Sequence, residues 1–276
     1  MRRINDLKGG EWMLASKSVW KRSFGVGKGE HKIRRKTNPT CKPIDLCADF
    51  VKALSCKGEI VVDPFAGTGG VVLGAQKIGR KAVGAELDAE QIEAYQKCSG
   101  LLSTLFRTYD PLAIKHGDYR DVFPSSPDNE PWADLVLTDP QWFDLDRRRK
   151  SSRYQKGKGN QERPMAAYKE APVFKTLDDW AEYMRVFAVW ASNVLKKGRY
   201  LAYFMEDAYL DGEYTFLSEI SKNAVKSVGF VPQGEWIWYN EARRACIFGY
   251  PSRMITSRTH TKVLFFTNGK LEDQDG

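Results

Sequence analysis

Histidine and cysteine, the side chains that most often bind transition metals, are scarce in this chain. Its 276 residues include three scattered histidines and five cysteines, and no two cysteines stand as a Cys-x-x-Cys pair. The odd number and the spacing argue against a zinc site and against a disulfide framework, and they suit a reducing compartment. We therefore expect a cytoplasmic protein that binds no metal.

Long apolar runs are also missing. No stretch approaches the ~20 apolar residues of a membrane-spanning helix, and no signal peptide opens the chain. We accordingly expect no membrane contact. With 42% hydrophobic residues and no visible internal repeat, the chain can form one large α/β domain with an ample core.

Basic residues outnumber acidic ones, and they are unevenly distributed. The net charge is +8, which favours polyanionic partners. Residues 1–36 hold 11 Lys or Arg against 3 Asp or Glu, with Trp12, Trp20 and Phe24 between them. Such a segment is either a solvated arm that wraps the domain or a surface for phosphates and stacked bases. The sequence leaves both interpretations open.

A second basic segment lies in the middle of the chain. In the loop at 146–172, apolar residues are nearly absent from residues 147–163, so this stretch cannot fold on itself, and a loop of such length is usually functional or disordered. We expect a mobile loop that contacts nucleic acid, with binding that weakens steeply as salt rises. The candidate contacts are Arg147, Arg148, Arg149, Lys150, Arg153, Lys156 and Lys158.

The most informative stretch is Ile60–Gly70, which predicts a buried strand, then a glycine-rich turn, then a helix that begins at Gly70. Glycines are needed where the backbone turns sharply and approaches a ligand closely. The first N–H groups of the helix point into that turn and can bind a ligand there. We therefore interpret Asp63–Gly70, here called the glycine-rich turn, as a cofactor site.

Three cofactors compete for this turn. A phosphate-binding loop requires a lysine after its last glycine, and none follows Gly70. The dinucleotide-binding motif Gly-x-Gly-x-x-Gly fits Gly67 and Gly69, but this chain has Val72 where the motif has its third glycine. S-adenosylmethionine (SAM) fits better, because Glu86 ends the next strand, 81–86, where a carboxylate accepts both ribose hydroxyls. The alternative is a tight turn of the kind found in any α/β protein.

A second ligand-side motif follows the strand at 133–138. Asp139, Pro140 and Trp142 come directly after it, at an edge of the sheet where α/β proteins bind ligands. A carboxylate and a proline-fixed carbonyl can each accept one N–H of a nucleobase amine and make it a better nucleophile, while an aromatic ring supports a flipped base. An ordinary Asp-Pro turn is the other interpretation.

Together, the stretches Asn38–Pro43, Val62–Gly70 and Ala85–Asp88 resemble the amino-methyltransferases of DNA. That family shows a Thr-Gln-Lys-Pro helix start, an Asp-Pro-Phe-x-Gly-x-Gly turn and an Asp-Pro-Pro-Tyr catalytic loop. The resemblance is strong over residues 37–143 and looser to residue 267. The chain departs at Gln141, where the family usually has a second proline; a glutamine loosens the loop and could hydrogen-bond a base.

The resemblance implies a Rossmann-like fold, with a mostly parallel seven-stranded sheet and helices on both faces. Residues 37–267 would form the methyltransferase domain, between the arm of residues 1–36 and a polar tail at 268–276. The cofactor would be SAM and the substrate double-stranded DNA with a flipped adenine, in the cytoplasm of a prokaryote or a phage host. An acidic first residue in the catalytic loop resembles the adenine-N6 branch, since the cytosine-N4 branch usually begins with serine.

Cytosine-N4 or RNA amine methylation, and an inactive protein that only binds nucleic acid, remain alternatives. The resemblance implies that Thr40 and Lys42 flank the methionine end of SAM, that Glu86 binds the ribose and that Asp118 lies at the adenine edge. The methionine and the sulfonium would be lined by Asp63, Phe65, Ala66, Gly67 and Gly69. The target amine would be held by Asp139, Pro140 and Trp142.

Hydrophobic periodicity predicts the remaining elements. Helices are expected over 43–54, 90–105, 179–196 and 216–228, and strands over 199–205, 236–239 and 262–267. Glu206 and Asp207 end one of these strands on the ligand side and are candidates for supporting the site, and residues 258–260 could approach it.

Overall fold

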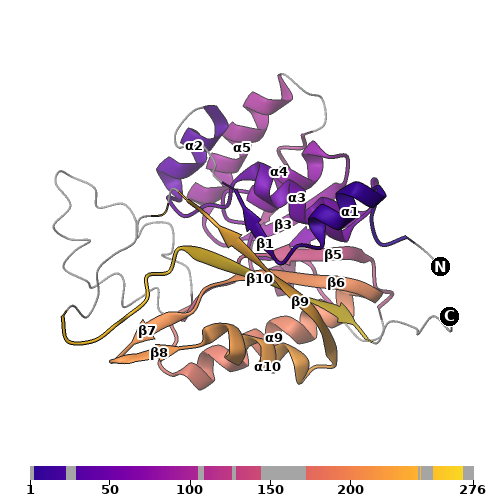
Figure 1. Ribbon diagram of the computed structural model, residues 1–276. Coiled ribbons are helices and arrows are strands. Elements are labelled where there is room, and N and C mark those ends of the chain that lie inside the picture. Colours follow the sequence, from indigo (N-terminus) through magenta and orange to yellow (C-terminus); the bar gives the residue numbers. More distant parts are fainter. Residues whose placement is uncertain are drawn as a thin grey trace.

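The fold is organised around one eight-stranded sheet, seen in a computed structural model that describes residues 3–22, 29–104, 109–125, 129–143, 172–241, 243 and 251–269 (Figure 1). Its strand order is β1-β9-β10-β6-β5-β2-β3-β4. Strand β10 runs antiparallel to both of its neighbours, and the other neighbouring pairs are parallel. The strands are β1 Val19–Lys21, β2 Ile60–Asp63, β3 Lys81–Glu86, β4 Ile114–His116, β5 Ala133–Thr138, β6 Leu195–Met205, β9 Phe230–Tyr239 and β10 His260–Asn268.

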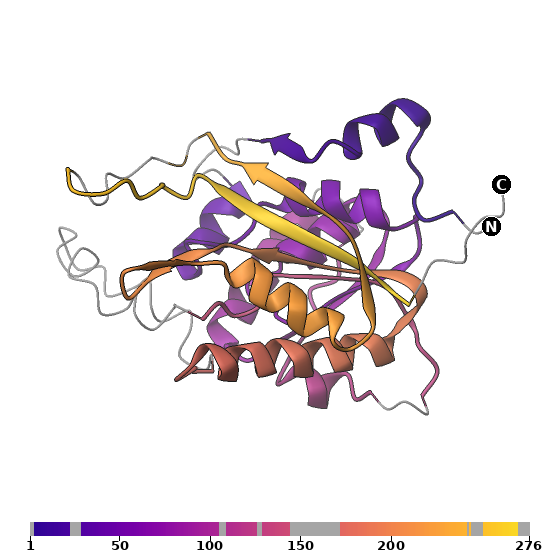
Figure 2. The same cartoon turned by 60° about the horizontal axis from the view of Figure 1, so that its bottom comes forward.

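Helices cover both faces of the sheet, as Figures 1 and 2 show. One layer contains α3 (Ile44–Leu54), α4 (Gly70–Lys77) and α5 (Ala89–Ser103), and the other contains α6 (Tyr119–Val122), α9 (Leu177–Val194) and α10 (Leu217–Lys226). Outside these layers lie α1 (Gly9–Ala15), α2 (Gly29–Thr37) and a hairpin of β7 (Ala208–Leu210) and β8 (Glu213–Thr215). None of the helices in the described ranges is long and apolar enough to cross a membrane.

The apolar runs of the central strands exist because both faces of the sheet are covered. In β5, Leu135 and Leu137 pack toward α3 and α4, while Val136 between them packs toward α9. Successive side chains of a strand point to opposite faces, so a strand buried on both sides is apolar over most of its length. Strand β2 pairs in parallel with β3 on one side and with β5 on the other, so the carboxyl ends of all three strands lie at one edge of the sheet.

The predicted fold class is confirmed, with eight strands in the sheet rather than seven. The additional strand is β1, which pairs in parallel with β9 at the edge of the sheet. Its central residue Trp20 is buried, and its ring stacks on Phe50 at 4.6 Å and lies 5.2 Å from the ring of Trp236. Part of the segment predicted as a basic arm thus contributes to the core.

Strand β9 begins at Phe230, six residues before the predicted start at Trp236. Pro232 and Gly234 hide the strand in the sequence, since neither favours a regular ladder. The structure accommodates them with an irregularity in the pairing to β10, between Phe265 and Phe266. At the other end of the chain, β10 extends to Asn268, inside the predicted tail, and residues 270–276 lie outside the described ranges.

Candidate active site at the carboxyl edge of the sheet

The glycine-rich turn has the backbone that its composition predicted. Gly67 and Gly69 have φ angles of +52° and +79°, a left-handed conformation that residues with a Cβ rarely adopt. A Cβ on Gly69 would also lie 2.2 Å from the ring of Tyr95, and one on Gly70 would lie 2.8 Å from the Lys42 carbonyl oxygen. These positions need glycine for the turn and for close packing beneath it.

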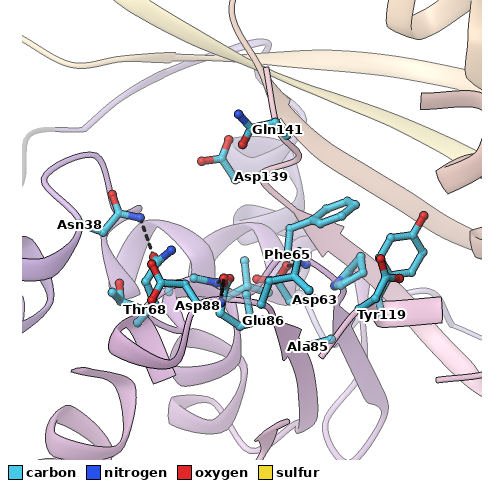
Figure 3. Close-up of a pocket in the computed structure, with 18 of the residues that line it drawn as sticks. Asn38, Asp63, Phe65, Thr68, Ala85, Glu86, Asp88, Tyr119, Asp139 and Gln141 are labelled. Carbon is cyan, nitrogen blue, oxygen red and sulfur yellow. Dashed lines mark hydrogen bonds between the residues drawn. The ribbon is translucent and has the colours of Figure 1, made fainter. Parts of the chain in front are cut away.

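A cavity of about 340 Å³ opens above this turn, at the carboxyl ends of β2, β3 and β5 (Figure 3). Its volume lies within the range of about 300–1,000 Å³ that is typical of small-molecule sites. Eight residues singled out from the sequence line it: Lys42, Asp63, Phe65, Ala66, Gly67, Glu86, Asp118 and Asp139.

Four other predicted residues do not line this cavity among the residues described: Thr40, Gly69, Pro140 and Trp142. Thr40 is exposed, and its hydroxyl donates to the Asn38 side chain at 2.9 Å. Asn38 does line the cavity and donates to Gln91 at 3.0 Å, drawn as a dashed line in Figure 3. The Asn38–Pro43 turn therefore faces the cavity through Asn38, Cys41 and Lys42 rather than through Thr40.

Glu86 joins the end of β3 to the glycine-rich turn. Its carboxylate accepts the N–H of Gly67 at 2.6 Å and the N–H of Asp88 at 2.9 Å. Burial raises the pKa of this carboxyl, and the two backbone donors oppose that shift. The predicted ribose ligand therefore also fixes the shape of the turn.

Asp63 joins the end of β2 to the end of β5. The Thr138 hydroxyl donates to its carboxylate at 2.5 Å, and the Phe65 N–H donates at 3.2 Å. Burial raises the pKa of Asp63 to about 7, against the effect of these two donors. Because Thr138 precedes Asp139, this contact couples the glycine-rich turn to the predicted catalytic loop.

Asp118 lines the cavity from the start of α6. Its carboxylate accepts the backbone N–H of Arg120 at 2.8 Å and forms an ion pair with the Arg120 guanidinium at 2.8 Å. The hydrogen bond from Arg120 lowers the pKa of the carboxyl. Both side chains line the cavity, so the predicted adenine position presents a carboxylate and a guanidinium together.

Arg34 is a site residue that sequence reasoning missed. It comes from α2 and is fully buried, with Nε donating to the Thr68 carbonyl at 3.0 Å and Nη2 to the Lys42 carbonyl at 2.7 Å. It lines the cavity, yet its buried Nη1 has no hydrogen-bond partner among the described residues. In the sequence, Arg34 stands in the run Arg34-Arg35-Lys36, which gives no sign that one of the three points inward.

Two further polar atoms at the cavity are buried without a hydrogen-bond partner in the described part of the chain: Thr68 Oγ1 and Asp88 Oδ2. A buried polar group left unpaired costs about 1–3 kcal/mol, so such groups usually serve a ligand or water. Donors by the glycine-rich turn and carboxylates by β3 match the charged amino-acid end and the hydroxylated sugar of SAM. The residues present therefore fit the predicted cofactor.

The predicted catalytic loop follows β5, and Figure 3 shows Asp139 and Gln141 together, apart from Glu86 and Asp88. Asp139 forms an ion pair with Lys42 through Oδ2, while its Oδ1 is buried with no hydrogen-bond partner in the described ranges. The Gln141 carbonyl accepts the Trp180 indole N–H at 2.9 Å, which ties the loop to α9. Lys42, predicted to flank the methionine end of SAM, thus directly contacts Asp139 in the predicted catalytic loop.

Glu206 and Asp207 directly follow β6 on the ligand side, as expected, and each makes polar contacts of its own. Glu206 accepts from Arg243 at 2.7 and 2.9 Å and from Thr261 at 2.6 Å. Asp207 accepts from the Ser218 N–H and from Lys262, each at 2.9 Å. Burial alone raises the pKa of each carboxyl, but these donors lower it overall.

The nucleic-acid contacts predicted in the central basic segment lie outside the described residues: Arg147, Arg148, Arg149, Lys150, Arg153, Lys156 and Lys158. Within the described ranges, no three His, Cys, Asp or Glu side chains gather in a way that could hold a metal ion.

Known proteins provide an independent comparison. Residues 8–97 match the N6/N4 methyltransferase family, described as DNA methylase. Among solved structures, TrmN from Thermus thermophilus is 14% identical with a TM-score of 0.44, and the alignment covers 81% of this chain and 47% of that one. A putative RNA methyltransferase from Pyrococcus horikoshii is 15% identical with a TM-score of 0.44, over 96% of this chain and 100% of that one. This chain thus spans about half the length of the Thermus protein.

The strand order, the glycine-rich turn and the cavity above it define the fold class of this chain, which is the Rossmann-like fold of the SAM-dependent methyltransferases, with SAM as the implied cofactor. More narrowly, residues 8–97 carry the N6/N4 amino-methyltransferase signature of the DNA methylases, which confirms the family resemblance of the sequence motifs.

Proposed function

We propose that this protein methylates the N6 amine of adenine in double-stranded DNA, with the target base flipped out of the helix. The observation that carries the proposal is the position of Asp139. It follows β5 at the cavity wall and has one oxygen, Oδ1, buried and available to a ligand. A carboxylate at that position can accept an N–H from an exocyclic amine next to the methyl donor.

The cavity residues divide the cofactor between them. The carboxylate of its methionine end would be held by Arg34 Nη1, the Thr68 hydroxyl and the first N–H groups of α4, since these donors carry positive charge or partial positive charge. Glu86 would accept the ribose hydroxyls, and Asp118 with Arg120 would flank the adenine. When bound, SAM supplies a methyl group activated by its attachment to a sulfonium.

The acceptor is prepared by the catalytic loop. Asp139 Oδ1 and the Pro140 carbonyl each accept one N–H of the amine, which directs the nitrogen lone pair toward the methyl group. Asp139 and Pro140 would thereby orient the amine nitrogen for direct methyl transfer, and the proton that the nitrogen gives up would pass to solvent. Trp142 offers an aromatic surface on which a flipped base stacks. No covalent enzyme intermediate is required.

The decisive experiment measures transfer of tritiated methyl groups from SAM to DNA and to RNA, followed by digestion to nucleosides. We expect N6-methyladenine in DNA with the wild type and at least a hundredfold lower rate with Asp139→Ala, as for loss of a main electrostatic group (about 10²–10³-fold). Asp45→Ala is the matched control, because that carboxylate pairs with Lys77 at the surface. SAM binding, followed by calorimetry, should persist in both variants.

Each alternative has its own outcome in this experiment. Label in RNA alone would reject DNA as the substrate, and N4-methylcytosine would reject adenine. Absence of label from both polymers, with SAM binding intact, would indicate an inactive protein that only binds nucleic acid.

A further inference from the structure

Lys42 joins the two halves of the site. It follows α2 in the Asn38–Pro43 turn, and its side chain is buried even though it carries an ammonium group. The ammonium forms an ion pair with Asp139 Oδ2. Its Nζ also lies 5.3 Å from the centre of the Trp142 ring and 5.1 Å from that of Phe204, distances typical of cation–π contacts.

This arrangement uses the two oxygens of Asp139 differently. Oδ2 is occupied by Lys42, while Oδ1 has no hydrogen-bond partner within the described part of the chain. A free carboxylate can rotate and present either oxygen, but an ion pair on one oxygen fixes the other. The backbone of Lys42 is itself held, because its carbonyl accepts Arg34 Nη2 at 2.7 Å.

We propose that Lys42 is a positioning residue for methyl transfer, which holds Asp139 so that Oδ1 faces the target amine, and keeps the Trp142 ring beside it. This inference rests on the proposed role of Asp139 in holding the amine. It assigns Lys42 to the acceptor side of the site, whereas the sequence motif had assigned it to the methionine end of the cofactor.

The charges around Asp139 give Lys42 a second effect. The ionisable groups that interact electrostatically with this carboxyl are Lys42 itself, Glu206 after the end of β6, Asp63 from the end of β2 and the Cys47 thiol from α3. Burial raises the pKa of Asp139 and Glu206 raises it further, while Lys42 lowers it. Lys42 is thus the cation that favours the ionised form, which is the form that accepts an amine N–H.

Replacing Lys42 with methionine keeps the apolar stem against Trp142 and Phe204 and removes the charge. We expect Lys42→Met to bind SAM within about threefold of wild type. Its kcat for methyl transfer should fall about a hundredfold, the size of effect produced when one catalytic electrostatic contact is lost. The acid limb of its kcat–pH profile should move to higher pH. Without the ammonium the pKa of Asp139 rises, so the carboxyl is protonated, and cannot accept the amine N–H, up to a higher pH.

Two further variants sharpen the test. Lys42→Arg retains a cation and should recover part of kcat and the original acid limb. Lys77→Met removes an ion pair with Asp45 from the surface and should behave as wild type. If Lys42→Met fails to fold, Lys42→Gln replaces it, since its amide can donate to Asp139 but carries no charge.

One measurement does not need a substrate. Carbon-13 NMR of protein labelled at the aspartate carboxyls, with Asp139→Asn to assign the resonance, follows the titration of Asp139 directly. A titration at higher pH in Lys42→Met than in wild type supports the proposal, even if the wild type were to methylate neither polymer. An unchanged titration would overturn it. A loss of SAM affinity greater than tenfold with an unchanged acid limb would overturn it as well, in favour of a cofactor ligand.

Discussion

Arg34→Met tests how the cavity recognises the amino-acid end of its cofactor. The guanidinium makes two hydrogen bonds to backbone carbonyls, those of Thr68 and Lys42, and leaves Nη1 at the cavity. A hydrogen bond to a charged group contributes about 1.5–3 kcal/mol, and about 1.4 kcal/mol corresponds to a tenfold change in affinity. Loss of the contact from Nη1 to a carboxylate should therefore weaken binding about 10- to 150-fold.

The ligand series makes this prediction specific. SAM and its demethylated product both carry the carboxylate, whereas 5′-methylthioadenosine lacks the amino-acid end altogether. Calorimetric titration of Arg34→Met should show the full loss for the first two ligands and less than about a twofold change for the third. The difference between the two losses isolates the contact, as in a double-mutant cycle.

Structural damage would give a different pattern. Arg34→Met also leaves two buried carbonyls without their donor, so the free energy of unfolding should fall, and urea denaturation measures by how much. Arg35→Met, one residue along α2, is the matched control. An equal loss of affinity for all three ligands would mean that Arg34 only supports the turn, and no loss for any of them would refute the reasoning altogether.

Two other predictions concern stability. Gly69→Ala should lower the free energy of unfolding by about 2 kcal/mol or more in urea denaturation, because its φ of +79° disfavours a side chain and the new Cβ would meet the Tyr95 ring. Gly100→Ala, on the open surface of α5, is the control and should be neutral or stabilising. Equal effects of the two substitutions would contradict this account. Burial raises the pKa of Asp63 to about 7 in the folded protein. Between about pH 4 and pH 7 the folded state therefore keeps a proton that the unfolded chain releases. The free energy of unfolding should consequently fall as pH rises through that window. Asp63→Asn should lessen that fall, and an unchanged slope would exclude Asp63 as its source.

Much of the fold could be predicted because the central strands can be recognised from their own residues alone. The observed bounds of β3 and β5 are the predicted ones, 81–86 and 133–138, since each is an apolar run that ends in a turn or an acidic residue. Strand β1 escaped prediction because it has three residues, and two of them, Val19 and Lys21, are exposed. A segment this short is a strand only because β9 pairs with it.

The cap of α9 shows how local chemistry can also settle a boundary. The helix is capped by Thr176, whose hydroxyl accepts the Asp179 N–H at 3.0 Å. The Asp179 carboxylate in turn accepts the Thr176 N–H at 3.0 Å. Reciprocal capping of this kind joins residues three apart, so it is encoded in the local sequence.

The sequence alone determined the cofactor turn, because left-handed backbone at Gly67 and Gly69 restricts the residue type at fixed positions. It also determined the motif at Asp139, since a strand end and a proline are local features. Only the tertiary structure decided that Arg34 reaches Thr68 and that Lys42 pairs with Asp139. These contacts span 34 and 97 residues, and they depend on how α2 and its following turn pack over the sheet edge. No local pattern distinguishes a buried, paired cation from its solvated neighbours.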